Sequence, residues 1–452
     1  MSTSTMAPAR RPEIKTALPG PKAQEIIAAD AQFVTPSYPR PAFKLVVERA
    51  QGVWVEDVDG NTFLDCNAGV AVCSTGHCHP EVVHAIQEQA EQLIHMCGTD
   101  YYYRHMPALA QKLDEIVPVP SPTKTHFANS GTEAVETALK LAMHATGREK
   151  FIAFFNSFHG RTLGSLSLTA SRSAQRTGFK RQALDVVHVP YPNAFRNPFS
   201  EADCGDGGAT QGALNWIEER LFKTTTPASE VAAIVVEAVQ GEGGYVPAPQ
   251  GFLQGLRRIC DENGILLIID EVQSGMGRTG KMFASDHYDV KPDIVCIAKG
   301  IGSGLPIGAC VARADLMTWK PGAHASTFGG NPVCIAAALK TIELLEGGLV
   351  QNSAEVGAYL KSGLERLKQK YDCIGDVRGM GMMIGVEFVE SRSSNKADAD
   401  LRDRVEMACF ERGLIILGAG ANTIRWSPPL ILTKENVDVA LQIFDEAIAA
   451  SI

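Results

Sequence analysis

Short apolar runs recur through the middle of the chain, and stretches with helical periodicity separate them. The runs are FIAFF, LDVVHVP, AAIVVEA, ILLIID and DIVCIA, which begin at residues 151, 184, 232, 265 and 293. Short runs with so few polar positions are typical of strands that are buried on both faces of a parallel sheet. The pattern therefore predicts an α/β fold with a large domain, in which helices flank a mostly parallel central sheet.

The two ends of the chain have a different pattern. Residues 44–65 alternate apolar and polar positions and break at Asp59-Gly60, which predicts strands joined by a tight turn. From about residue 345 the pattern becomes that of a smaller α+β unit. It ends in a helix over residues 434–449, one face of which carries Val437, Leu441, Phe444 and Ile448.

These changes of pattern predict three segments. Residues 1–80 are expected to be an N-terminal segment that belongs to the small domain, and residues 81–344 to form the large domain. Residues 345–452 are expected to supply the rest of the small domain. The small domain is thus expected to be built from both ends of the chain.

Composition narrows the class of protein. The 452 residues are 45% hydrophobic and 21% charged, which is ordinary for a soluble globular enzyme. A net charge of −9 argues against nucleic-acid binding, and no apolar run approaches the ~20 residues of a membrane span. The first 15 residues lack the apolar segment of a secretory signal and are expected to form a loosely attached tail.

The cysteines bear on location and on metals. All 11 are spread singly without a C-x-x-C pair, as expected of reduced thiols in a cytoplasmic protein. Cys73, His77, Cys78 and His79 are close enough in sequence to suggest a metal site. However, a glycine and a proline bracket the last three, and adjacent ligands rarely bind one tetrahedral ion without a second pair elsewhere. We therefore interpret this stretch as a structural loop and expect no metal.

Three of the apolar runs end in reactive side chains, namely Glu237, Asp270 and Lys299. In open α/β sheets, ligands bind where the carboxyl ends of the strands meet the following loops. Any one of these side chains could simply be solvated at the end of its strand. Three of them at one edge of a sheet indicate a functional site.

A lysine and a carboxylate at neighbouring strand ends are typical of pyridoxal 5′-phosphate (PLP) chemistry. A partly desolvated lysine amine forms a Schiff base with the PLP aldehyde. A carboxylate that pairs with the protonated pyridine nitrogen keeps the ring able to accept electrons. Such a partner would explain why a buried run ends on Asp270. The residues therefore predict PLP as the cofactor, with Lys299 and Asp270 as catalytic residues.

The phosphate of PLP needs an anion site, and residues 125–147 predict one. A strand-like THFAN leads into Ser130, Gly131 and Thr132, and a helix rich in alanine and glutamate follows. Free N–H groups at the start of a helix, together with hydroxyls and a glycine, bind phosphate. The sequence SGTE also resembles a capping box, and the two interpretations are compatible.

A second glycine-rich stretch, AKGIGSGLPIG at residues 298–308, resembles a dinucleotide-binding loop. It lacks the G-x-G-x-x-G spacing, because the last position is Ile307. A nicotinamide cofactor is therefore not expected. We interpret the glycines as residues that let the backbone turn beside Lys299.

In combination, the motifs resemble those of the class III (ω-) aminotransferases, which are PLP enzymes of fold type I. The resemblance runs from about residue 40 to residue 448. The motifs that carry it are NSGTEAVETALKLA, FHGRTLGSLSLT, VVEAVQGEGGYVPAP, IIDEVQSGMGRTG, IAKGIGSGLPIGA and STFGGNP. Within the family, the chain is similar to the 4-aminobutyrate aminotransferases and to amino-acid racemases that share the scaffold.

The resemblance implies a role for each residue around the cofactor. Lys299 would form the Schiff base and carry the proton, while Asp270 would pair with the pyridine nitrogen. Gly131 and Thr132 would hold the phosphate, helped by Thr327 from the neighbouring subunit of a homodimer or a dimer of dimers. The residues implied around the ring are Phe158 stacked on it, His159 beside Phe158, Val272 beneath it and Gln273 at its phenolic oxygen.

The resemblance also implies three substrate-binding residues. Arg161 matches the residue that binds the distal carboxylate of 4-aminobutyrate or 2-oxoglutarate, and Arg425 matches the one that binds the α-carboxylate of glutamate. The planar guanidinium fork suits carboxylates. Glu242 matches the acid that pairs with Arg425 when no α-carboxylate is present. In the alternative interpretation, both arginines only form surface salt bridges.

Two positions depart from the family pattern. Phe158 stands where 4-aminobutyrate aminotransferases often have tyrosine, and Ala238 stands where the family usually has proline. Residues 188–199, HVPYPNAFRNPF, are similar to the racemase branch, which also has phenylalanine at the stacking position. These departures leave the cofactor site intact but weaken the choice of 4-aminobutyrate over other amines.

The function that we expect is a cytoplasmic PLP-dependent aminotransferase. It would move an amino group from an ω-amino acid such as 4-aminobutyrate to 2-oxoglutarate. The alternatives are a racemase or epimerase on the same scaffold and a non-catalytic PLP-fold binding protein. The presence of both Lys299 and Asp270 counts against the last alternative.

Overall fold

The computed structural model describes residues 10–179 and 183–452. At its centre is a seven-stranded sheet, and the five apolar runs predicted as strands all lie in it. In spatial order the strands are β4 (Thr123–Ala128), β12 (Gly308–Arg313), β11 (Ile294–Ile297), β10 (Leu266–Asp270), β7 (Val231–Val236), β5 (Lys150–Phe154) and β6 (Asp185–Val189). Only β12 runs against the others, so the mostly parallel sheet predicted from the sequence is confirmed.

Both faces of this sheet are covered. Along β5, Phe151 and Ala153 pack with helix α5 (Gly131–Thr146), whereas Ile152 and Phe154 pack in the cluster that includes α10 (Phe252–Asn263). Successive residues of a strand point to opposite faces, so a continuous apolar run serves both. Further helices of this part of the chain are α4 (His105–Ile116), α6 (Leu163–Leu168), α7 (Glu201–Cys204), α8 (Gly208–Asn215) and α9 (Phe222–Thr224).

Two smaller sheets lie at the other end of the molecule. The first joins both ends of the chain, because β15 (Leu414–Ile415) pairs in parallel with β3 (Thr62–Asp65), next to β2 (Trp54–Asp57) and β1 (Val47–Gln51). The turn predicted at Asp59-Gly60 connects β2 to the antiparallel β3 and is confirmed. The second sheet has the order β13 (Ile374–Met380), β14 (Met383–Phe388), β17 (Thr423–Trp426) and β16 (Leu417–Ala419).

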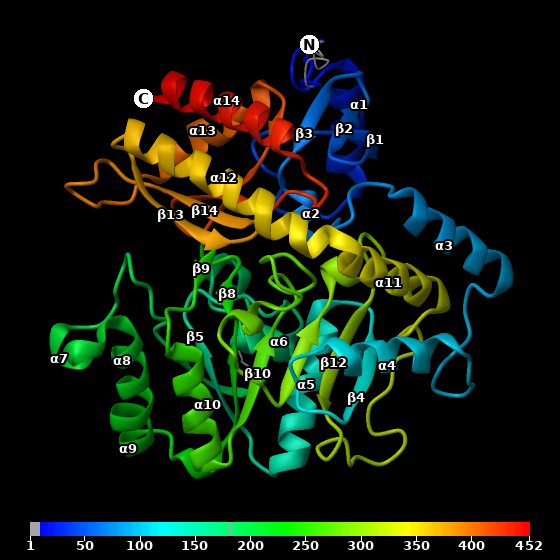
Figure 1. Cartoon of the computed structure of the whole chain (residues 1–452), viewed down its shortest axis with the longest axis vertical. Helices are drawn as coiled ribbons and strands as arrows, with labels where there is room; N and C mark the ends of the chain where they lie inside the picture. The colour runs from blue at the N-terminus through cyan, green and yellow to red at the C-terminus, as the bar shows by residue number, and fades with distance from the viewer. Residues whose placement is uncertain (1–9, 180–182) are drawn as a thin grey trace, which may run out of the picture.

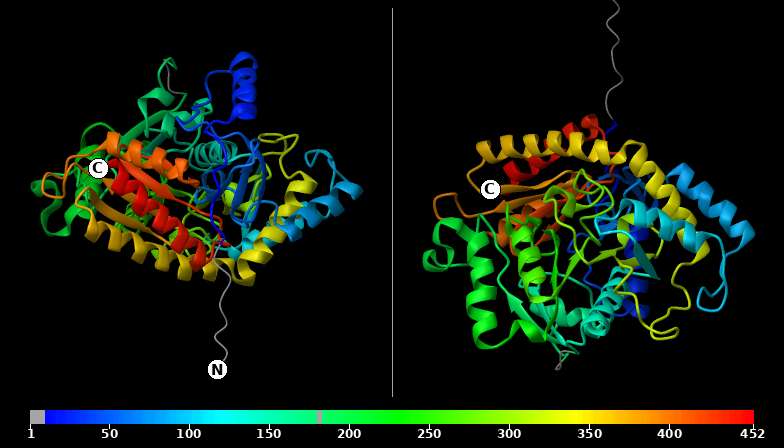
Figure 2. Two further views of the ribbon diagram at one scale, coloured as in Figure 1. Left: turned by 90° about the horizontal axis from the view of Figure 1, so that it is seen from above. Right: turned by 60° about the horizontal axis from the view of Figure 1, so that its bottom comes forward.

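Long helices cover these sheets. Figure 1 shows α13 (Ala399–Glu411) and α14 (Lys434–Ser451) at the same end of the molecule as α1 (Pro21–Phe33) and β1–β3, away from the large sheet. In Figure 2, α11 (Pro332–Leu344) and α12 (Val350–Lys370) follow one another as a bent rod. Helix α3 (Pro80–Gln92) packs on α11. The remaining short elements are α2 (Ala68–Ala71), β8 (Val239–Gln240) and β9 (Val246–Pro247).

Part of the expected N-terminal tail is attached to the first residue of β3. Of the tail expected over the first 15 residues, residues 1–9 lie outside the described residues, but the rest is attached: the backbone of Glu13 pairs with that of Thr62. The boundaries at residues 80/81 and 344/345 stay a prediction. Within residues 10–179 and 183–452, no helix is both long enough and apolar enough to cross a membrane.

Candidate active site

A cavity of about 430 Å³ opens at the carboxyl ends of the parallel strands. It is where the loops after β4, β5, β7, β10 and β11 converge, because strands that run in parallel present their ends at one edge. Eleven of the residues singled out in the sequence line it: Ser130, Gly131, Thr132, Phe158, His159, Arg161, Glu237, Asp270, Val272, Gln273 and Lys299. The other three, Glu242, Thr327 and Arg425, are not among its lining residues.

The start of α5 forms one end of the cavity. Ser130 is the N-cap, and its hydroxyl accepts a hydrogen bond from the Glu133 N–H at 3.3 Å. The expected capping box is wrong, because the Glu133 carboxylate accepts from the N–H of Asn129 instead. The N–H groups of Gly131 and Thr132 have no acceptor in the described part of the chain. A helix start with free donors is an anion site.

The Thr132 hydroxyl is engaged by neighbouring hydroxyls. It lies 2.7 Å from Ser165 Oγ and 2.9 Å from Thr162 Oγ1. Gly160 permits this approach, since a Cβ there would lie 2.2 Å from Thr132 Oγ1. This cluster of hydroxyls was not predicted from the sequence. Its members nevertheless lie in two of the family motifs: Thr132 in NSGTEAVETALKLA, and Thr162 and Ser165 in FHGRTLGSLSLT.

Asp270 is buried at the end of β10 and has two protein partners. Its Oδ2 lies 2.8 Å from His159 Nδ1, and its Oδ1 accepts the Val272 N–H at 3.0 Å. Burial pulls the pKa of His159 down, but the hydrogen bond and the charge of Asp270 outweigh it and raise that pKa. A proton on His159 Nδ1, between the imidazole and the carboxylate, stabilises the carboxylate of Asp270.

The neighbouring acid, Glu271, does not face the cavity. It is fully buried and accepts hydrogen bonds from Ser274 Oγ, Ala284 N and the backbone and hydroxyl of Ser285. Four donors satisfy the carboxylate where it lies, so Glu271 fixes the loop that follows β10.

Glu237 holds two loops together. Its Oε2 accepts the N–H of Phe158 at 3.3 Å, and its Oε1 accepts the N–H of Gly241 at 3.2 Å. Burial, together with the charge of Asp270 and against the opposing charge of His159, raises the pKa of Glu237 to about 7. A carboxyl with such a pKa can hold a proton near neutral pH.

Lys299 lies just after β11, in a backbone conformation with a φ of 48°. Burial lowers the pKa of its amine, although the charges of Glu242 and Asp270 oppose the shift. A lysine whose pKa is lowered has more neutral amine near pH 7, and the neutral amine is the nucleophile and base.

Arg161 is exposed at the rim of the cavity, with its guanidinium carbon 5.6 Å from the centre of the Phe158 ring. It forms no ion pair with any described residue. A guanidinium held beside an aromatic ring without a carboxylate partner is available for an anionic ligand.

The buried Arg425 forms an ion pair with the half-buried Glu242 next to this cavity. Arg425 Nη1 lies 2.5 Å from Glu242 Oε1, and the side chains are 7% and 19% exposed. Burial favours the neutral carboxyl, but the charge of Arg425 outweighs it, and the pKa of Glu242 is lowered. The alternative interpretation, that Arg425 only forms a salt bridge at the surface, is wrong because Arg425 is buried.

Thr327 is not among the residues that line the cavity. It is exposed, as is its neighbour Phe328, which is 61% exposed. The loop is attached through Ser326, whose Oγ accepts from Asn129 Nδ2 at 3.1 Å. The completion of a neighbouring site by Thr327 stays a prediction.

The two histidines of the stretch 73–79 form hydrogen bonds within the protein. His77 Nε2 bonds Asp65 Oδ2 at 2.7 Å, and the ring of His79 caps α3 by accepting the N–H of Glu81. The hydrogen bond to Asp65 raises the pKa of His77 to about 10.

The residues present fit PLP. Two free N–H groups at the start of α5 suit a phosphate, and the buried Oε1 of Gln273 has no partner among the described residues. A Cβ at position 131 would lie 2.7 Å from Val272 Cγ1, so glycine keeps this wall of the cavity open. The other eight lining residues had no predicted role in the site; they are Val72, Asn129, Gly160, Ala298, Gly304, Leu305, Pro306 and Ile307.

Known proteins are similar to this chain in sequence and in fold. The family model described as aminotransferase class III matches residues 37–448. The alanine/serine racemase of Pyrococcus horikoshii is 38% identical over 97% of this chain and 92% of the racemase. The 5-aminovalerate aminotransferase of Pseudomonas aeruginosa is 37% identical over 89% of this chain and 93% of that enzyme.

A solved structure agrees with these matches. The crystal structure of an amine transaminase from an uncultivated Pseudomonas species, in its PLP-bound form, matches with a TM-score of 0.84. The two chains are 29% identical, and the match covers 93% of this chain and 98% of the transaminase. The expectations of PLP as the cofactor and of fold type I are thereby confirmed.

Proposed function

This chain belongs to the class III aminotransferases, which depend on PLP, and from that membership we propose that it transfers the amino group of an ω-amino acid, such as 4-aminobutyrate, to 2-oxoglutarate. The observation that carries the proposal is the ion pair between the buried Arg425 and Glu242. An ω-amine has no carboxylate next to its reacting carbon, so a buried arginine there needs another anion. Glu242 supplies that anion.

Several residues would hold the cofactor in this proposal. The N–H groups of Gly131 and Thr132 would bind the phosphate, and the Asp270 carboxylate would pair with the ring nitrogen. Ser130, Phe158, His159, Val272, Gln273 and Glu237 complete the cofactor site. Thr327 of a second subunit adds to the phosphate site in a homodimer or a dimer of dimers.

When bound, PLP supplies an aldehyde that condenses with amines and a ring that accepts electrons from the substrate carbon. Lys299 removes the proton from the amine-bearing carbon, since burial lowers the pKa of its amine. Asp270 would pair with the ring nitrogen, and the hydrogen bond from His159 keeps its carboxylate oriented.

Two arginines recognise the substrates. Arg161, which has no carboxylate partner in the described residues, binds the distal carboxylate of either substrate. Arg425 binds the α-carboxylate of glutamate or 2-oxoglutarate once Glu242 has moved aside. One pocket therefore accepts substrates with one or two carboxylates.

The second candidate is racemisation or epimerisation of α-amino acids. Two observations favour it: 38% identity with an alanine/serine racemase, and phenylalanine at position 158. A racemase returns the proton to the substrate carbon and consumes no keto acid.

One assay separates the two. The purified protein is incubated with 4-aminobutyrate, 5-aminovalerate and single-enantiomer amino acids, with and without 2-oxoglutarate. Our proposal expects glutamate to form from an ω-amine only when 2-oxoglutarate is present. Inversion of an α-amino acid without a keto acid, with no glutamate from any ω-amine, establishes the racemase instead.

A further inference from the structure

A row of three residues crosses the sheet β13–β14–β17. Arg378 on β13 lies opposite Gly385 on β14, which in turn lies opposite Arg425 on β17. Residues directly opposite one another on neighbouring strands point to the same face of a sheet. Both arginines therefore leave the same face, on either side of a glycine.

The loop 241–245, which carries Glu242, lies on this face over Gly385. A Cβ at position 385 would be 2.9 Å from the carbonyl oxygen of Gly244 and 3.2 Å from Cβ of Tyr245. The absent side chain is thus what allows the loop to lie between the two arginines.

Each arginine binds the loop at a different point. Arg425 pairs with the carboxylate of Glu242, while Arg378 donates from Nε and Nη2 to the Gly244 carbonyl at 3.0 and 2.7 Å. The N–H of Gly420 also donates to the Glu242 carbonyl at 2.8 Å. The backbone that follows the Glu242 side chain is therefore fixed at two carbonyls, those of Glu242 and Gly244.

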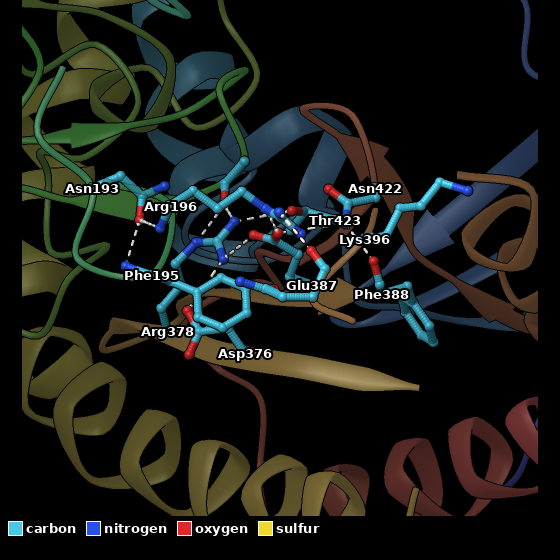
Figure 3. Close-up of polar contacts among 12 residues, drawn as sticks. Asn193, Phe195, Arg196, Asp376, Arg378, Glu387, Phe388, Lys396, Asn422 and Thr423 are labelled. Carbon is cyan, nitrogen blue, oxygen red and sulfur yellow. Dashed lines mark hydrogen bonds and ion pairs between the residues drawn. The ribbon is translucent and has the colours of Figure 1, made fainter. Parts of the chain in front are cut away.

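Arg378 is itself held by a buried network (Figure 3). Its Nη1 donates to Glu387 Oε2 at 2.5 Å, and its Nη2 reaches Thr423 Oγ1 at 3.0 Å. The other oxygen of Glu387 accepts from Arg196 Nε. Glu387 is 3% exposed and Arg378 10%, so the guanidinium has one orientation, with two donors aimed at the loop.

From this geometry we propose that Arg378 is a positioning residue for Glu242. By fixing the loop, it sets how easily an incoming carboxylate displaces Glu242 from Arg425. The inference deepens the proposed function and rests on it in one respect, namely that Arg425 is the site at which a substrate carboxylate binds.

The test uses glutarate, a dicarboxylate without an amine, titrated into the PLP-bound enzyme by calorimetry. In Arg378→Met the loop loses two hydrogen bonds, while Glu387 keeps Arg196 as its partner. Glu242 then moves aside more readily, and glutarate binds more tightly, by roughly 3- to 10-fold. General damage to the sheet has the opposite effect and weakens binding. An unchanged or weakened affinity overturns the proposal.

A double-mutant cycle shows whether the effect passes through Glu242. In a Glu242→Gln background, Arg378→Met is expected to change glutarate affinity by less than about 2-fold. An equal gain in both backgrounds overturns the proposal. Arg378→Lys keeps the charge opposite Glu387 but loses the paired donors, so it is expected to give a smaller gain. It replaces Arg378→Met if that variant does not fold, and no gain then counts against the proposal.

Arg196→Met is the matched control, because Arg196 binds the same carboxylate of Glu387 but makes no hydrogen bond to loop 241–245 in the described chain. Its glutarate affinity is expected to stay at the wild-type value, and a gain equal to that of Arg378→Met refutes the specific role. If the wild type uses no ω-amine, only the assignment of the amino-donor substrate is refuted, since glutarate binding involves no amino donor.

Discussion

The imidazole of His159 and the carboxylate of Asp270 are joined by a 2.8 Å hydrogen bond although they lie 111 positions apart. The His159 side chain is fully buried, and that of Asp270 is 5% exposed. Asp270 therefore keeps one fixed orientation at the end of β10, with its charge stabilised before any ligand arrives.

Replacement of Asp270 by asparagine keeps this shape and removes the charge. PLP is expected to bind still, while proton removal from the substrate slows by roughly 100-fold or more, since the ring accepts electrons less readily. Single-turnover absorbance measures that step. The control is Glu271→Gln next to it, which is expected to lower thermal stability without slowing proton removal. Near-normal proton removal in Asp270→Asn contradicts our interpretation of this acid.

Lys299→Ala is expected to reduce turnover by at least about 100-fold, because the amine that moves the proton is lost. The wild-type protein should be yellow, and borohydride should attach the cofactor to the peptide that contains Lys299, as mass spectrometry can verify. Attachment to another lysine would mean that the catalytic lysine has been misidentified.

Glu242 and Arg425 are expected to affect opposite half-reactions. Glu242→Ala should slow the half-reaction with the ω-amine more than that with glutamate, since Arg425 is left unpaired. Arg425→Ala should weaken 2-oxoglutarate by ~2–5 kcal/mol through loss of a buried charge-assisted pair. Arg161→Ala should impair both halves. Rapid-mixing absorbance of the cofactor measures each half, and equal effects of the first two variants on both halves would rule out the exchange.

Glu237 predicts a pH dependence of stability. Its folded pKa of about 7 lies above the ordinary value of 4.5, so the folded protein holds an extra proton between these values and loses stability as the pH rises through them. From pH 5 to pH 8, the unfolding free energy of cofactor-free wild type should fall relative to that of Glu237→Gln, by at most roughly 3 kcal/mol. Chemical denaturation at both pH values measures this difference, and a constant difference would show that Glu237 titrates normally.

Assembly is open to a direct measurement. If Thr327 completes the site of a second subunit, light scattering should give at least twice the 48.5 kDa of one chain, down to low concentration. Thr327→Val should weaken PLP about tenfold without dissociating the subunits, since the substitution removes one charge-assisted hydrogen bond. A fully active monomer is incompatible with this arrangement.

Much of the cavity could be predicted from the sequence, because a short stretch of sequence determines each part of it. An apolar run that ends in an acid or a lysine places that side chain at a strand end, and S-G-T before an alanine-rich stretch places donors at a helix start. Parallel strands then bring Glu237, Asp270 and Lys299 to one edge of the sheet. These features follow from periodicity and chain direction alone.

Tertiary packing decided what the sequence left open. His159 bonds Asp270 rather than solvent, Glu271 turns away into a set of backbone and serine donors, and Glu133 bonds Asn129 instead of closing a capping box. Arg378 and Arg425 come to face one loop only because the register of β13, β14 and β17 sets them in one row across Gly385. His159 and Asp270 lie 111 positions apart in the chain. No local pattern encodes such a contact, a strand register or the space left by a glycine on a partner strand.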